Sequence, residues 1–141
     1  MKVRQSFEQA ICILLLIGVS DTHIKSHELS QKLDLSDSYL KKITRQLVVS
    51  NLIESKASKL GGFILKKSLS DISLLDIFEA IEGKEHFVET THLVEKVFDN
   101  SSMIKETEDM FVSYLDKAEY HYKKKLKEIT LEQIVNEAHR I

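Results

Sequence analysis

The 141-residue chain contains one cysteine, no proline, no tryptophan and only four glycines. The single cysteine, Cys12, excludes an internal disulfide and any metal site built from several thiolates of one chain. The longest apolar run, Ile11 to Val19, is much shorter than the roughly 20 residues that span a bilayer. No small-residue cleavage site follows this run, so it does not have the form of a signal peptide. We therefore expect a globular, cytoplasmic protein.

The common catalytic signatures are also missing. The sequence contains no P-loop, no Gly-x-Ser-x-Gly, no His-Glu-x-x-His and no pair of carboxylates in a plausible cleft context. These patterns carry phosphate binding, nucleophilic catalysis and metal-assisted hydrolysis. Their absence predicts a protein that is not an enzyme and carries no cofactor.

Charge is divided unevenly along the chain, although the net charge is only −2. Residues 1–70 contain 11 lysines and arginines against 6 aspartates and glutamates, a net of +5. Residues 71–141 contain 9 against 16, a net of −7. A basic half joined to an acidic half is typical of a protein whose first half approaches a polyanion. Chance patterning of a charged surface is the alternative that charge alone leaves open.

The first predicted helix covers residues 7–19 and is apolar on nearly every face. Such a helix must be buried on all sides. A chain of this size rarely covers one of its own helices so completely, which suggests contact with a second subunit.

Two short helices and a tight turn are predicted next. Ser26 is expected to cap the first of them, and Asp34-Leu35-Ser36 forms the turn, with Ser36 as the cap of the second. The second helix covers residues 37–50. Leu40, Ile43 and Leu47 share one of its faces, and the other carries Ser38, Lys41, Lys42, Arg45 and Gln46. A second helix that is apolar inside and basic outside is typical of a helix-turn-helix.

A hairpin is predicted directly after the basic helix, from two short alternating segments, Leu52–Lys56 and Phe63–Lys66. Gly61-Gly62 between them supplies the positive φ values that a tight hairpin needs. The hairpin therefore has the form of a two-stranded wing with lysines near its tip.

Capping boxes mark two further helices. Ser73-x-x-Asp76 opens a helix to about Glu82 that ends at Gly83, and Thr130-x-x-Gln133 opens a short last helix. Residues 84–101 are compatible with helix, loop or both. A long helix is predicted from residue 102 to about residue 128. Its apolar residues are separated by intervals of three, four or seven residues, which is close to a heptad pattern. We expect this stripe to be a subunit interface, because little of the chain remains to pack on it.

Several of these segments together resemble the Rrf2 family of bacterial regulators, which includes IscR, NsrR and CymR. The segments are Ser36-x-Ser38-Tyr39-Leu40, Leu52-Ile53, Gly61-Gly62-Phe63, Ile72-Ser73-Leu74-Leu75-Asp76-Ile77 and Ala80-Ile81-Glu82-Gly83. The resemblance extends from the start of the chain to about Gly83. It implies a homodimer in which the long helix pairs with its symmetry mate and the first helix packs on the partner.

The chain departs from the pattern of that family in three places. The predicted recognition helix carries Lys41-Lys42, which favours contacts with phosphate or guanine. The wing lacks the family's Arg-Gly-Pro run and has Ala57-Ser58-Lys59-Leu60 before its glycines. A lysine must therefore take the DNA-contacting role of the family's arginine. The stretch of about His86 to Ser102 contains no cysteine, whereas several members ligate an iron–sulfur cluster with three cysteines there. We therefore expect no such cluster, and a small-molecule or protein effector received around Phe87 to Phe98.

Three residues outside these motifs could have either a structural role or a chemical one. Cys12 is expected to be a small buried hydrophobe, with a redox switch as the alternative. His86 and His92 are expected to be solvated surface residues. Their alternative is a divalent-metal site that includes neighbouring glutamates, namely Glu85, Glu89 and Glu95.

The sequence thus predicts a mainly α fold with a small β wing. A winged helix-turn-helix DNA-binding domain covers residues 1–83, and a linker, dimerisation helix and short C-terminal helix cover residues 84–141. The expected function is a sequence-specific transcriptional regulator, acting as a homodimeric repressor on a double-stranded DNA operator. The alternative is a winged-helix protein-interaction module that does not bind DNA. The residues expected to contact DNA are Ser36, Ser38, Tyr39, Lys41, Lys42, Arg45, Lys56 and Lys59. The residues expected at the dimer interface are Ile104, Phe111, Leu115, Ala118 and Tyr122.

Overall fold

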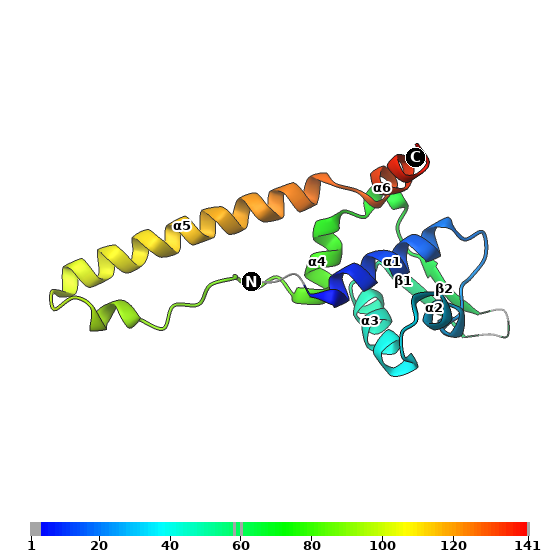
Figure 1. The fold of residues 1–141 in the computed structure, drawn as a ribbon, viewed down its shortest axis with the longest axis horizontal. Coiled ribbons are helices and arrows are strands. Elements are labelled where there is room, and N and C mark those ends of the chain that lie inside the picture. The colour runs from blue at the N-terminus through cyan, green and yellow to red at the C-terminus, as the bar shows by residue number, and fades with distance from the viewer. Residues whose placement is uncertain (1–3, 58, 60, 141) are drawn as a thin grey trace. The chain divides into compact units, whose positions relative to one another are not determined.

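The computed structural model describes residues 4–57, 59 and 61–140, and the chain forms two compact units (Figure 1). Residues up to 83 and from 126 onward form the winged unit. Residues 84–125 form the arm unit. The secondary structure is mainly helical with one two-stranded wing and one long helix, as the sequence predicts.

Helix α1 (Gln5–Val19) is the central helix of the winged unit. Its buried residues recur every three or four positions and pack against helices and a strand of the same unit. They are Phe7, Ala10, Ile13, Leu14 and Ile17. The opposite face is only partly covered: Leu15 and Leu16 are half-buried and Val19 is 56% exposed. Within one chain, the predicted burial of this helix on all sides is therefore incomplete.

Helices α2 (Ser26–Leu33) and α3 (Asp37–Val49) are joined by the predicted turn. Asp34 has a left-handed backbone with φ 52°, and the Leu35 amide donates to the Ser30 carbonyl at 3.1 Å. The predicted cap at Ser36 is confirmed, because its Oγ accepts a hydrogen bond from the Tyr39 amide at 3.3 Å. The predicted cap at Ser26 is wrong. Ser26 is the first helical residue, and Lys25 before it makes no side-chain cap.

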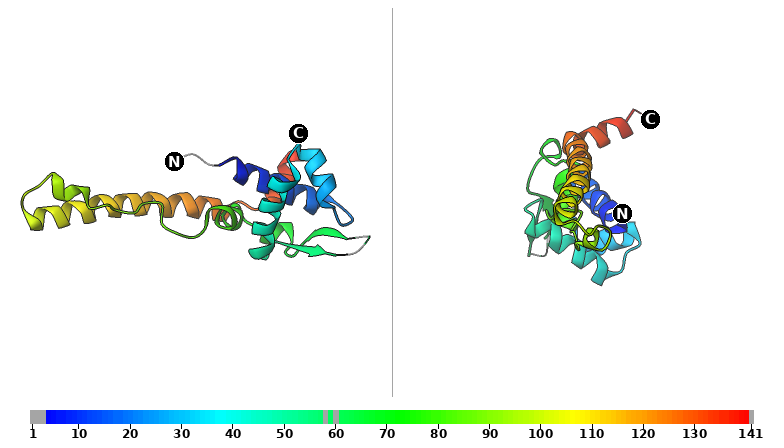
Figure 2. Two further views of the ribbon diagram at one scale, coloured as in Figure 1. Left: turned by 90° about the horizontal axis from the view of Figure 1, so that it is seen from below. Right: turned by 90° about the vertical axis from the view of Figure 1, so that its left-hand side faces the viewer.

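Strands β1 (Ile53–Lys56) and β2 (Gly62–Leu65) form the antiparallel wing, which projects from the helices of the winged unit (Figure 2). Ile24, in the loop before α2, pairs with Phe63 through two backbone hydrogen bonds of 2.7 and 3.2 Å. Gly62 has φ 144°, and a Cβ built there would lie 2.5 Å from the Ile24 carbonyl oxygen. The pairing that fixes the base of the wing therefore requires glycine at residue 62.

Both predicted capping boxes form, at Ser73 with Asp76 and at Thr130 with Gln133. A short 3-10 turn η1 (Leu69–Asp71) precedes α4 (Leu74–Glu82), and α6 (Leu131–Ala138) follows the second box. The Leu74 amide donates to the Ile129 carbonyl at 2.8 Å, and the Leu131 amide donates to the Ile72 carbonyl at 3.0 Å. These bonds attach α6 to the winged unit.

The arm unit consists of an extended segment and most of α5 (Ser101–Glu128). The segment after Gly83, for which the sequence left helix and loop open, is mostly loop with one 3-10 turn η2 (Leu93–Lys96). Thr90 and His92 hydrogen-bond to Glu108 on α5, and the Phe87 amide hydrogen-bonds to Glu119. The segment therefore lies along one side of the helix. Within the described ranges, no helix is both long enough and apolar enough to cross a membrane.

The close approach at Gly62 leads to a stability prediction. Gly62→Ala combines an unfavourable positive φ, worth about 1–3 kcal/mol, with contact to backbone atoms that cannot move aside. Gly83→Ala is the matched control, because Gly83 also has a positive φ of 85° but no atom lies within 4 Å of its built Cβ. We expect urea denaturation to give a larger loss of unfolding free energy for Gly62→Ala. Equal losses would mean that the Ile24 contact contributes nothing.

Candidate nucleic-acid interface

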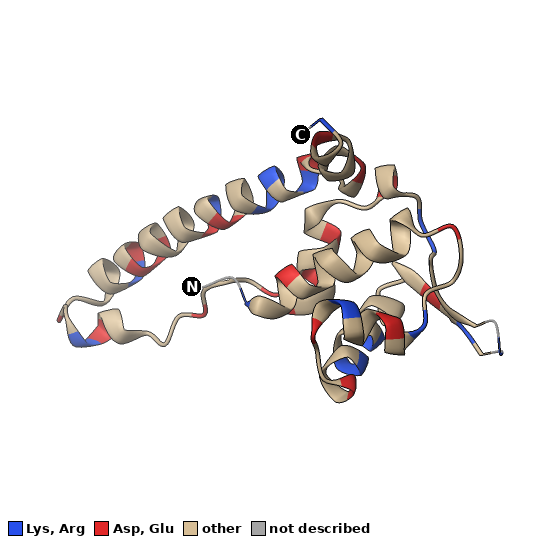
Figure 3. Ribbon diagram, turned by 45° about the vertical axis from the view of Figure 1, so that its right-hand side comes forward, with Lys and Arg blue, Asp and Glu red and all other residues tan. Residues whose placement is uncertain are grey.

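Helix α3 separates an apolar face from a basic one. Leu40, Ile43 and Leu47 are at most 1% exposed and pack on α1 and α4. Lys41, Lys42 and Arg45 lie at the intervening positions and are exposed. The spacing of about 3.6 residues per turn causes this division, and Figure 3 shows the resulting Lys and Arg segments on α3.

A partly buried hydrogen bond links α2 to α3. The Ser30 hydroxyl donates to the Asp37 carboxylate at 2.9 Å, and Ser30 is only 8% exposed. Asp37 is also in the first turn of α3, where a negative charge suits the helix dipole. The turn between the two helices is therefore held by side chains as well as by its backbone.

The residues predicted to contact DNA lie on two elements of the winged unit. Six belong to the start and outer face of α3: Ser36, Ser38, Tyr39, Lys41, Lys42 and Arg45. All six are exposed, including the Tyr39 ring at 38%, although Ser36 already uses its Oγ for the cap. The other two, Lys56 and Lys59, are exposed on the wing. The structure thus brings the eight residues to the surface of one unit.

The five cations of this set have no acidic partner within the part of the chain that the structure describes. Among the residues that the structure describes, Lys41, Lys42, Arg45, Lys56 and Lys59 make no ion pair. Surface cations without carboxylate partners are available to phosphate groups, which dominate the affinity of proteins for DNA.

One further cation lies close to α3 but is not among the residues predicted from the sequence to contact DNA. Arg4, at the start of α1, lines a cavity of about 300 Å³ together with Tyr39, Lys42 and Gln46 of α3. Its Nε lies 3.4 Å from Oε2 of Glu82 in α4. No local pattern could have indicated this position, because Arg4 is 35 residues or more from the α3 side chains that it joins.

The predicted dimer-interface residues lie along α5 with unequal exposure. Leu115 and Ala118 are exposed, whereas Ile104, Phe111 and Tyr122 are half-buried. The Tyr122 ring contacts Phe87 of the same arm unit edge to face, with ring centroids 5.9 Å apart. A second exposed apolar stripe, not predicted, consists of Met103, Met110 and Tyr114 at 51%, 51% and 62% exposure.

The partners of His86 and His92 are not the neighbouring glutamates that the sequence suggested as possible metal ligands. His86 lies beside Asp116 and Glu119, and His92 lies beside Glu108. All three carboxylates belong to α5. A local window of sequence could not indicate them, since they are 16 to 33 residues away.

Cys12 is half-buried on α1. Burial, and secondarily the negative charge of Glu8, raise the pKa of its thiol. A thiol with a raised pKa is a poor nucleophile and a poor metal ligand, because both roles require the thiolate.

A basic helix behind a tight turn, with a two-stranded wing beside it, defines a winged helix-turn-helix protein. Residues 3–137 match the family model of Rrf2, described as "Iron-dependent Transcriptional regulator". The chain is 39% identical over 104 residues to "Putative HTH-type transcriptional regulator YwgB" of Bacillus subtilis, covering 72% of this chain and 67% of YwgB. It is 34% identical over 139 residues to "Putative HTH-type transcriptional regulator YffB" of Lactococcus lactis, covering 97% and 88%. The chain belongs to the Rrf2 family of transcriptional regulators.

Solved structures share the fold. CymR of B. subtilis superposes with a TM-score of 0.69 at 20% identity, covering 96% of this chain and 97% of CymR. IscR of T. potens superposes with a TM-score of 0.70 at 21% identity, covering 98% and 88%. The predicted fold class and the resemblance to the Rrf2 family are both confirmed. As a member of a family of regulators, the chain is not an enzyme, as its sequence predicts.

Proposed function

We propose that this regulator binds a pseudo-palindromic operator as a homodimer and represses transcription, with α3 in the major groove and the wing on the flanking backbone. The observation that carries the proposal is the outer face of α3. Its three cations, Lys41, Lys42 and Arg45, are exposed and have no acidic partner among the described residues. A two-fold dimer would place two such helices about one turn of DNA, roughly 34 Å, apart.

Exposed apolar surface supports the dimer. On α5, Leu115 is 43% exposed and the stripe of Met103, Met110 and Tyr114 is more exposed still. On α1, the half-buried Leu15 and Leu16 continue to the exposed Val19. Charged residues occupy much of the remaining surface of α5 (Figure 3). A contiguous apolar stripe on a long, otherwise charged helix is typical of a helix that pairs with another.

A cysteine-ligated cluster does not fit this chain, although the family model is described as iron-dependent. Iron–sulfur clusters are held mainly by cysteine thiolates, and the chain has only Cys12, whose thiol pKa is raised. The segment 84–100 offers no cysteine. We therefore assign the regulator no cluster of this type. The signal to which it responds is a small molecule or a partner protein.

The reading role of α3 is tested with the double variant Lys41→Ala/Lys42→Ala. If these residues read guanine, each loss should weaken operator binding by about 1–3 kcal/mol. The matched control is Lys124→Ala/Lys127→Ala, which removes two exposed lysines, also within one turn, from the end of α5. Fluorescence anisotropy with an operator mapped by promoter-wide binding gives the affinities. Operator affinity equal to that of wild type would exclude α3 as the reading helix. Absence of DNA binding by the wild-type protein would favour a protein-interaction module.

The wing should contact phosphates without reading bases. Each neutralised phosphate contributes about 0.9 to the slope of log affinity against log salt concentration. We expect Lys56→Ala/Lys59→Ala to reduce that slope by up to about 1.8 and to weaken specific and nonspecific duplexes alike. An unchanged slope would remove the wing from the interface.

The absence of a thiolate-ligated cluster has a direct spectroscopic consequence. Protein purified without oxygen should be colourless, with no visible charge-transfer absorption and no acid-labile sulfide, because no set of thiolates is present to hold a cluster. Optical spectra and sulfide analysis of the anaerobic protein measure this. A brown protein with sulfide near one cluster per chain would contradict the assignment.

A further inference from the structure

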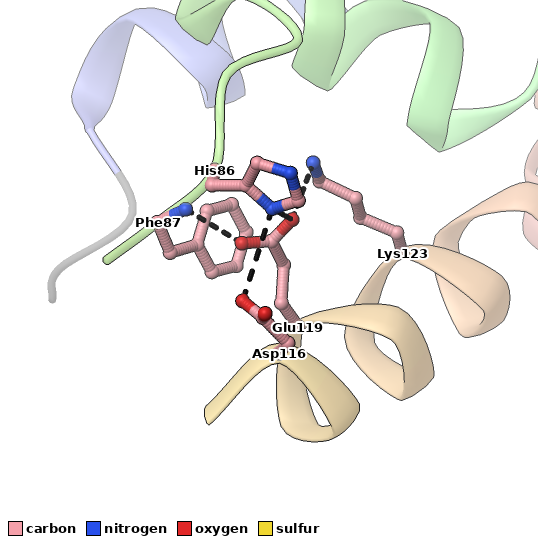
Figure 4. Close-up of polar contacts among 5 residues, drawn as sticks. All are labelled: His86, Phe87, Asp116, Glu119 and Lys123. Atoms are coloured by element: carbon pink, nitrogen blue, oxygen red, sulfur yellow. Dashed lines mark hydrogen bonds and ion pairs between the residues drawn. The ribbon is translucent and has the colours of Figure 1, made fainter. Parts of the chain in front are cut away.

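A polar cluster in the arm unit is built around Glu119 of α5 (Figure 4). Glu119 is only 7% exposed, although it lies on a helix with many exposed residues. Its Oε1 accepts a hydrogen bond from the Phe87 amide at 2.6 Å, and its Oε2 accepts one from the Lys123 ammonium at 3.0 Å. These bonds hold the carboxylate in one orientation.

The carboxylate of Glu119 is surrounded by hydrogen-bond donors and cationic side chains. Burial favours its neutral form, but the Phe87 amide, Lys123 and His86 together outweigh burial, so the pKa of Glu119 lies below its usual range. Cations close to a buried carboxylate offset the cost of its burial. In the structure, Lys123 supplies part of that positive charge.

The imidazole of His86 lies between two carboxylates of α5, those of Glu119 and Asp116. The His86 Nδ1 lies 3.4 Å from Oε2 of Glu119 and 3.8 Å from Oδ1 of Asp116. One donor atom from each of the three residues falls within 4.8 Å of the other two. Among the residues that the structure describes, this is the one place where three potential ligand side chains meet so closely. Neighbouring ligands of a cation bound at about 2.1 Å lie roughly 3.0–3.4 Å apart, so a small closure would complete the set.

We propose that His86, Asp116 and Glu119 form a binding site for one divalent first-row transition-metal ion. One imidazole with two carboxylates is a donor set of borderline hardness, which suits zinc, manganese and ferrous ions rather than a thiolate-bound cluster. The side chains of His86 and Asp116 are 75% and 46% exposed, which leaves room for water ligands and for exchange with solution. This donor set differs from the thiolate set that an iron–sulfur cluster needs, so a metal response does not require cysteine.

Lys123 competes with the metal ion for Glu119. Its ammonium nitrogen contacts Oε2 of Glu119 and lies 5.0 Å from the centroid of the Phe87 ring. An incoming cation takes the place of the ammonium at Oε2, and Lys123 then turns to solvent. Metal binding would therefore weaken the hold of Lys123 beside Phe87, which links the metal to the segment beside α5.

The site is tested with the full-length protein and Zn²⁺ in competition with a chromogenic chelator, in the absence of DNA, so the outcome does not depend on the proposed DNA function. Wild-type protein should bind one ion per chain. His86→Gln and Glu119→Gln should each weaken binding at least about 10-fold, since each removes a ligand. His86 is exposed, so His86→Gln keeps the test valid if Glu119→Gln destabilises the fold.

Two variants separate this site from adventitious binding. His92→Gln is the matched control, because it removes a loop histidine that also faces an α5 carboxylate but belongs to no three-ligand group among the described residues. Its zinc affinity should equal that of wild type. Lys123→Met should bind zinc more tightly, by up to about fivefold, because it removes the competing ammonium. Equal weakening in His86→Gln and His92→Gln, or unchanged or weaker binding in Lys123→Met, would overturn the proposal.

Discussion

The burial of one face of α3 is the constraint on which the proposed DNA-binding surface depends. Leu40, Ile43 and Leu47 are almost fully removed from solvent, which is worth about 1.5–3 kcal/mol for each side chain. Their positions fix the rotation of α3 about its own axis, so the cations at the intervening positions must face outward. The basic surface is therefore oriented by the core rather than by its own contacts. The adjoining chain continues this packing, since Leu52 and Ile53 are each 1% exposed at the base of the wing.

Most of the winged unit was predictable because its signals are local. The caps at Ser36, Ser73 and Thr130 each involve a donor and an acceptor three residues apart, so neighbouring sequence contains the whole interaction. Ser26 failed as a cap because α2 begins one residue earlier than expected, at Ser26 itself. The residue before Lys25 is Ile24, held extended by its pairing with Phe63, which is 39 residues further along the chain. A capping preference worth about 1 kcal/mol did not decide the boundary against such a tertiary contact.

The candidate sites divide in the same way. The outward residues of α3 follow from the helical period alone. Ser38, Lys41, Lys42 and Arg45 are exposed as predicted, whereas Gln46 is half-buried. Arg4 beside Lys42, and His86 beside Glu119, depend on how distant elements pack, and neither pair leaves a trace in a local window. The seam predicted on α5 illustrates a third case. Periodicity correctly showed that the helix carries an apolar stripe, but it could not show which stripe the chain covers with its own segment 84–100.

Helix α5 contacts the segment 84–100 on one face and carries its exposed apolar stripe on another. At about 100° per residue, Glu108 and Glu119, which hold the segment 84–100, share one side of the helix. Met103, Met110 and Tyr114 lie on the opposite side. The predicted seam through Phe111 and Leu115 lies roughly 20–80° from the two glutamates, nearer to their side than to the exposed stripe. A partner helix on the exposed stripe would therefore not compete with the segment for the same face. A ligand at the Glu119 side would change how that segment is held while leaving the paired face intact. A ligand shifts an equilibrium only by its difference in affinity for two states. In the proposed dimer, this separation would allow the arm to respond to a ligand through the loop while the subunits stay paired.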